Sequence, residues 1–169
     1  MLNQSADIYK SFVTALSGIT YDGNSIPVYS ISPPKNPGAI FIQLGTITTV
    51  EEGCKDLFGH ECTMDIQVID ESNRNYTSPK VAEEIAGTIQ TTLTPYVTSV
   101  VSMTDFDMIY ITLDNAFNDG GLFESDRSYR KIMQWRFLIN EQPEFSNWIL
   151  STGNWRDIAL WIDTEVWID

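Results

Sequence analysis

Two stretches of the chain show the apolar spacing of an amphipathic helix. In residues 6–17 apolar residues recur at helical spacing: Ile8, Phe12, Ala15 and Leu16. Ser5 suits the N-cap of this helix, and Gly18 suits its C-terminal cap. In residues 78–93 Ser78 is the expected N-cap and Pro79 the first helical residue. The expected buried stripe of this second helix is Val81, Ile85, Ile89 and Leu93.

Other stretches have the composition or the period of two that is typical of strands. They are residues 26–31, 39–50, 62–68, 97–113 (interrupted near Asp105) and 129–140. The first contains Pro27, which places it at a sheet edge. The second and third are expected to pair antiparallel. Between the strands, residues 51–61 and 114–126 are interpreted as loops.

The last long strand has the clearest alternation. Its apolar residues occupy every second position, and Arg130, Arg136 and Asn140 lie on the other face. The expected buried row is Tyr129, Met133, Trp135, Phe137 and Ile139. This strand therefore should cover the core with one face and meet solvent with the other.

The order of elements is α-β-β-β-α-β-β, without βαβ regularity. Such an order favours an α+β fold: a small, mostly antiparallel sheet with helices packed on one face. The length of 169 residues suits a single core. We expect one domain over residues 1–142, followed by a C-terminal arm over residues 143–169.

The arm differs from the rest of the chain in composition. It contains four of the five tryptophans, Trp148, Trp155, Trp161 and Trp167, and a net charge of −4. So many aromatic side chains are costly in water, and exposed apolar patches mark contact surfaces. These tryptophans are the candidate interface residues. Docking on a neighbouring protein and packing on the arm's own domain both remain open from the sequence.

Charge and hydropathy exclude several classes of partner. The chain has 23 acidic and 10 basic residues, a net charge of −13, which repels nucleic acid and anionic membranes. No apolar run approaches the roughly 20 residues that span a bilayer. The first residues lack a secretory signal, so folding in a cytoplasm is expected.

Residue types that can bind metals or catalyse reactions are present but do not form a recognisable site. Cys54, His60, Cys62 and Asp65 are near one another in sequence, yet they lack the paired spacing of zinc modules. Residues 114–120 resemble a calcium loop but place Ala and Phe where oxygen ligands are needed. The chain has no phosphate-binding GxxxxGK[ST], no GxGxxG and no GxSxG motif. We therefore expect no catalytic residues, no cofactor and no metal.

Adjacent carboxylates are a further pattern that acid–base chemistry can use. The candidates are Glu51-Glu52, Glu83-Glu84 and the nearby Asp105 and Asp107. Nothing in the sequence brings them together in a pocket, so solvated faces explain them.

Residues 6–141 resemble a known family in the order of their predicted elements and in the residue pattern of each element. The segments that carry the resemblance are Leu16-Ser17-Gly18, Ile26-Pro27-Val28-Tyr29, Ile40–Gly45, Thr63–Val68, the helix at 78–93, Ile111–Asn115 and Tyr129–Phe137. Together they are similar to the tail-completion (tail-terminator) or head–tail joining proteins of tailed bacteriophages.

This resemblance implies a non-enzymatic virion protein, assembled in the bacterial host, that forms a ring in the neck. The ring, a hexamer or a dodecamer, would complete the tail or join it to the head, contact portal, neck or tail-tube proteins, and pass DNA through an acidic channel.

Two other hypotheses remain open from the sequence. The first is an acidic binding module or inhibitor that acts as a monomer or dimer. The second is a small enzyme that uses Cys54, His60 or the acidic loop.

Overall fold

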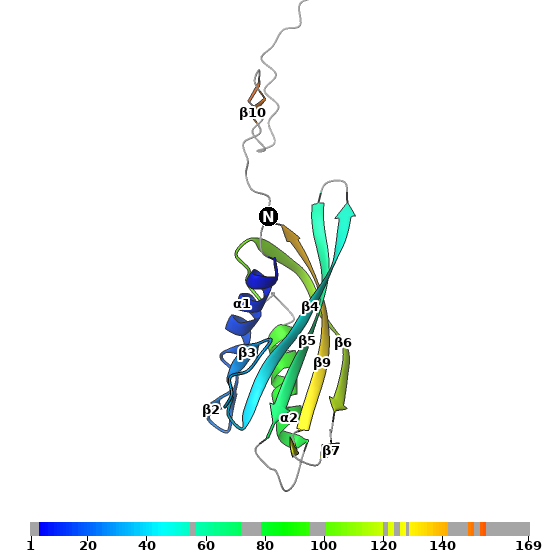
Figure 1. Ribbon diagram of the computed structural model, residues 1–169. Coiled ribbons are helices and arrows are strands. Elements are labelled where there is room, and N and C mark those ends of the chain that lie inside the picture. Colours follow the sequence, from blue (N-terminus) through cyan, green and yellow to red (C-terminus); the bar gives the residue numbers. More distant parts are fainter. Residues whose placement is uncertain are drawn as a thin grey trace, which may run out of the picture.

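The structure, a computed structural model, describes residues 4–54, 57–71, 79–94, 101–119, 122–123, 126–127, 129–141, 149–150 and 153–154. Within these residues a five-stranded sheet has the order β3-β4-β5-β9-β6. Its strands are β3 (Val28–Ser30), β4 (Ile40–Cys54), β5 (Leu57–Asp70), β6 (Phe106–Asp119) and β9 (Tyr129–Glu141). The helices α1 (Gln4–Leu16) and α2 (Lys80–Leu93) cover one face of this sheet (Figure 1). The α+β class and the order of the main elements are confirmed.

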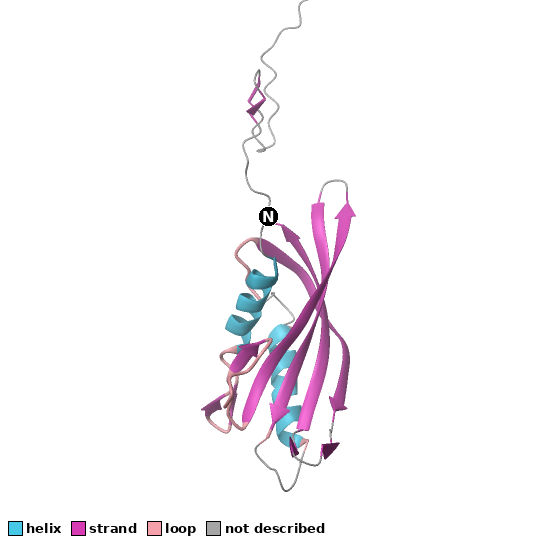
Figure 2. Cartoon of the chain, in the orientation of Figure 1, coloured by secondary structure: helices cyan, strands magenta, loops and turns pink. Residues whose placement is uncertain are grey.

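The sheet is antiparallel except at one edge. β4, β5, β9 and β6 pair antiparallel along the sheet, and β3 pairs with β4 in parallel. As predicted from Pro27, β3 lies at one edge. Figure 2 shows the resulting two layers, with the helices on one side of the long, twisted strands.

Three short hairpins accompany the main sheet. They are β1 (Thr20–Tyr21) with β2 (Asn24–Ser25), β7 (Leu122–Phe123) with β8 (Asp126–Arg127), and β10 (Ile149–Leu150) with β11 (Gly153–Asn154). The β1–β2 turn is Asp22-Gly23, whose φ angles are 49° and 78°. Positive φ at both central residues is the conformation of a type I′ hairpin turn, for which Asp-Gly is a preferred pair.

The core lies between the helices and the sheet. The largest fully buried side chains include Trp135, Phe12 and Phe137, and the rings of Phe12 and Phe137 lie 5.3 Å apart. The predicted alternation of β9 is confirmed, because Met133, Trp135, Phe137 and Ile139 are buried while Arg130 and Arg136 are exposed. Each large apolar side chain buried here contributes about 1.5–3 kcal/mol.

Helix α2 differs from its prediction in detail. Its N-cap is Pro79, not Ser78, and Ser78 lies outside the described residues. Its buried residues are Ala82, Ile85, Ala86, Ile89 and Leu93, whereas Val81 is only partly buried. The two alanines belong to the buried face because small side chains let the helix approach the sheet closely. Within the described residues, no helix is long and apolar enough to cross a membrane.

Two predicted loops are largely strand. The segment 51–61 continues β4 to Cys54 and starts β5 at Leu57, and the segment 114–126 extends β6 to Asp119. In the second case the cause is pairing, because the residues Asn115–Asp119 lie opposite Arg130–Gln134 of β9. The backbone groups of an extended segment need hydrogen-bond partners, and β9 supplies them on one side of β6.

The segment before β6 is not strand where the structure describes it. Val101 and Met103 are buried and do not belong to a strand, and residues 97–100 lie outside the described part. The backbone N–H groups of Thr104 and Asp105 donate to Asp7 Oδ2 of α1, at 2.9 and 3.2 Å. These two hydrogen bonds hold the residues just before β6 against α1.

Candidate interaction surface

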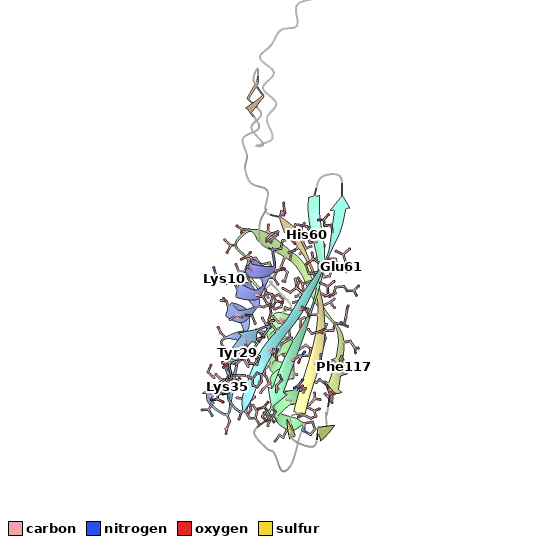
Figure 3. All side chains as sticks on the ribbon, viewed as in Figure 1. Lys10, Tyr29, Lys35, His60, Glu61 and Phe117 are labelled. Atoms are coloured by element: carbon pink, nitrogen blue, oxygen red, sulfur yellow. The ribbon has the colours of Figure 1, made fainter. Side chains whose placement is uncertain are left out.

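The face of the sheet opposite the helices carries a mixed set of side chains, which we call the open face. Its members on β4, β5, β6 and β9 are Thr48, Val50, Glu61, Thr63, Asp65, Tyr110, Thr112, Asp114, Phe117, Ile132, Gln134, Arg136 and Leu138. Figure 3 shows Glu61 and Phe117 on the sheet side of the molecule, away from Lys10 on α1. Because strand residues alternate between faces, these positions follow from the buried rows of the same strands.

One end of this sheet face is covered by the chain itself. Phe41 and Ile69 point away from the helices, yet each is only 3% exposed. The Tyr29 ring packs edge-on against Phe41, with centroids 5.9 Å apart, and the Tyr29 hydroxyl donates to the carbonyl of Pro37 at 3.1 Å. The Pro-rich segment after β3 therefore closes this end, and the open face is the part beyond it.

An ion-pair cluster occupies the middle of the open face. Arg136 Nη2 lies 2.9 Å from Asp114 Oδ1, and Nη1 lies 3.6 Å from Glu61 Oε1. The Tyr110 hydroxyl donates to the same Glu61 oxygen at 3.3 Å. The hydrogen bond to Asp114, together with its charge, raises the pKa of Arg136 above its ordinary value. The guanidinium therefore stays charged and ties β9 to its two neighbours.

Apolar side chains flank this cluster. Val50, Glu61, Leu138 and Tyr110 form one cross-strand row, in which Val50 is 58% and Tyr110 is 42% exposed. A second row places Ile132 beside Phe117, which is 47% exposed. Exposed aromatic side chains and arginine are among the residue types that are enriched in protein–protein contact surfaces.

The exposed apolar residues concentrate on β6. Of the five large hydrophobic side chains that the described residues expose, Ile109, Tyr110 and Phe117 belong to this strand. β6 is also the last strand of the sheet order, and it bulges after Met108 and after Leu113. A long edge strand is a template for pairing with another chain. The strand at the other edge of the sheet, β3, has only three residues.

A buried corner joins the start of α1 to the end of β9. His60 Nε2 lies 2.7 Å from Gln4 Nε2 and 3.9 Å from Glu141 Oε1, and the imidazole packs edge-on against Phe106. When Nε2 accepts the amide hydrogen of Gln4, the ring proton resides on Nδ1, which has no hydrogen-bond partner. These contacts hold the start of α1 and the end of β9 together, although the two segments are distant in the sequence.

The sequence candidates for metal or thiol chemistry do not converge where the structure describes them. Across the described ranges, no three His, Cys, Asp or Glu side chains are placed to hold a metal. His60 and Cys62 share the buried face and Asp65 lies on the other, because the strand alternates. The side chain of Cys54 lies outside the described residues. Burial raises the pKa of the Cys62 thiol, which keeps it protonated and unreactive.

Of the adjacent carboxylates, Glu83 and Glu84 each form a separate ion pair. Glu83 forms an ion pair with Lys131 at 3.1 Å, and Glu84 lies 3.8 Å from Lys80. These contacts join α2 to β9 and stabilise the first turns of the helix. They form no shared acid–base site in the part of the chain that is described.

The predicted interface residues Trp148, Trp155, Trp161 and Trp167 lie outside the described residues. The β6 surface is the feature that sequence reasoning missed. The segment Asp114–Asp119 is rich in Asn and Asp, a composition that favours a loop. The available signal was the length of the strand predicted at 129–140, whose hairpin partner needs a similar length.

Neither a family model nor a curated protein sequence matches the chain. Among solved structures, it is similar to a chain of one described as the virion of a native gene transfer agent (GTA) particle, with a TM-score of 0.66 and 14% identity. The similarity covers 83% of this chain and 99% of that one. At this identity the likeness establishes the fold: this α+β domain is one that a gene transfer agent virion also contains.

Proposed function

We propose that this protein is a structural, non-enzymatic component of a phage-like virion. In this proposal it forms a ring in the neck, where it completes the tail or joins it to the head. The supporting observation is the likeness to a chain of the gene transfer agent virion, which includes nearly all of that chain. The resemblance of the sequence to tail-completion proteins supports the same role by a separate route.

The surface supports assembly as the mode of action. A ring requires a heterologous interface, in which one region of a protomer meets a different region of the next. The open face and the β6 edge supply one such region, because they combine exposed Tyr110 and Phe117 with an ordered Arg136 cluster. Function would then reside in contacts between subunits. Sixfold symmetry is the family expectation, and twelvefold symmetry is the alternative.

The charge supports a passive role toward DNA. A net charge of −13 on each protomer makes a ring strongly negative. Such a channel repels the phosphate backbone and lets DNA pass without adhering.

The test is the mass and shape of the assembly formed by the full chain. Light scattering and native mass spectrometry over a concentration series should give a hexamer or dodecamer, and negative-stain images should show a ring with a central opening. Gold-labelled antibody should mark the neck of purified particles. A protein that stays monomeric at every concentration, and is monomeric in particles as well, would sink the proposal.

A further inference from the structure

We propose that residues 158–168 of one copy add as an extra strand to the β6 edge of a second copy, along Ile111–Asp119. This inference rests on the proposed ring and names its subunit joint. It begins from the edge: β6 ends the sheet order, and its outer half is exposed along the open face. Strand addition to such an edge provides main-chain hydrogen bonds, and the side chains at alternate positions provide specificity.

The C-terminal sequence has the pattern that this edge requires. From 158 onward one set of alternate positions is almost entirely aliphatic: Ile158, Leu160, Ile162, Thr164, Val166 and Ile168. The other set carries the polar and aromatic residues: Ala159, Trp161, Asp163, Glu165, Trp167 and Asp169. A period of two over eleven residues, rich in β-branched side chains, predicts a strand with one buried and one partly solvated face.

The two faces of this segment match the two faces of β6. On the helix side, Ile111 and Leu113 pack against the core but are only partly buried, because the sheet ends beside them. The aliphatic row would cover them and extend the core by one strand. On the open face, Trp161 and Trp167 would lie on the same side as the exposed Phe117. The acidic residues of that row would remain in water.

The proposed ring requires a second copy as the acceptor, because a ring joins one region of a protomer to a different region of the next. Glu141, the last residue of β9, lies opposite Phe106 at the start of β6. Reaching Ile111 on the outer side of β6 in the same copy requires about 20 Å, which combines two strand spacings across the sheet with five residues along β6. Residues 142–148, which precede the β10–β11 hairpin, span up to about 23 Å when extended. Chain length therefore permits docking in either copy, and the exchange experiment below distinguishes the two.

The test uses the full chain, with a proline placed in the proposed strand. Ile162→Pro removes one backbone donor and breaks the alternation, and Ser146→Pro in the connector is the matched control. Amide hydrogen exchange is measured for residues 111–119, with residues 62–68 of the buried β5 as an internal reference. Oligomer mass is measured on the same samples.

We expect the amides of 111–119 to exchange about tenfold or more faster in Ile162→Pro than in the wild type or in Ser146→Pro, with β5 unchanged. The oligomer mass should fall in Ile162→Pro only. If all three proteins form the ring and the amides of 111–119 exchange equally fast in all of them, the proposed strand addition to β6 is wrong. The proposed function would still stand in that case. Slow exchange of 111–119 in a dilute monomer would show docking within one copy, which also overturns it. Absence of any ring in the wild type would instead remove the proposed function.

Discussion

Arg136 on β9 reaches across the open face to Asp114, which bulges from β6, with 2.9 Å between Nη2 and Oδ1. The contact joins the edge strand β6 to β9 where the register of their pairing shifts, between Leu113 and Asn115. Asp114 lies in a segment that resembles a loop in sequence, so this ion pair helps to hold that segment as strand.

The first prediction concerns this pair. Asp114→Ala should lower the melting temperature of the wild type but leave an Arg136→Ala protein almost unchanged, because the aspartate then has no cation to bind. Thermal unfolding of the two single variants and the double variant checks this. Arg130, on the same strand and face, is the matched control: Asp114→Ala should keep its full effect in an Arg130→Ala background. Equal effects of Asp114→Ala in both backgrounds would contradict the coupling.

The second prediction concerns Gly45 at the bulge of β4. A Cβ there would lie 3.1 Å from the carbonyl oxygen of Asp65 and 3.2 Å from its Cβ, and the Gly45 carbonyl accepts the Tyr9 hydroxyl at 2.8 Å. Gly45→Ala should therefore cost about 1–3 kcal/mol, as overpacking does. Gly87→Ala on α2 is the control, since a Cβ there meets nothing within 4 Å. It should stabilise the helix by about 0.5–1 kcal/mol, and urea unfolding measures both.

The third prediction is a loss of stability at alkaline pH. The thiol of an unfolded chain ionises near pH 9.0, whereas burial raises the pKa of Cys62 in the folded chain. Between these two pKa values the unfolded chain binds fewer protons, so the free energy of unfolding falls as pH rises. Burial raises the pKa of Tyr9 and Tyr129 as well, which adds to the loss above pH 10.0.

Urea unfolding under reducing conditions at pH 8, 9 and 10 checks this pH dependence. Cys62→Ala lowers stability at every pH because it leaves a cavity, but its stability should decline less between pH 8 and 10. An identical decline in the variant and the wild type would assign the effect to other groups.

The fourth prediction concerns DNA and salt. We expect no measurable affinity for double-stranded DNA at physiological ionic strength, because the surplus of negative charge opposes phosphate contacts. The same charge repels one protomer from another, so added salt should strengthen the assembly by screening. Gel-shift and light-scattering titrations in sodium chloride measure both effects. A DNA shift that weakens with salt would refute the first part, and dissociation of the ring by salt would refute the second.

The fifth prediction concerns the arm as a whole. Every member of the core cluster within the described residues lies between Ile8 and Ile139. A chain ending at residue 142 should therefore remain soluble and melt cooperatively but fail to assemble, since tryptophan anchors commonly carry more than about 2 kcal/mol of binding energy each. Aggregation or unfolding of this chain would show that the arm belongs to its own domain's core. Normal assembly would show that the arm is not the joint.

The sequence by itself determined the features that repeat over a few residues. The periods of 3.6 and 2 located α1, α2 and the central parts of the long strands, and they identified the core-facing side of β9, on which Tyr129 alone of the predicted row is only partly buried. These patterns are local, because the period of a helix or a strand decides which side chains share a face. The α+β order followed from the same patterns, and so did the edge position of β3, since a proline cannot complete a central ladder.

Only the tertiary structure decided where strands end and what lies beside them. β6 runs to Asp119 because β9 offers it partners there, although Asn115 and Asn118 favour turns. Phe41 is buried on the face opposite the core, where the Tyr29 ring packs against it and the Tyr29 hydroxyl donates to the Pro37 carbonyl. The contact of Arg136 with Asp114 likewise depends on a register between strands. Such pairings join residues distant in sequence, so their energy appears only once the sheet has formed.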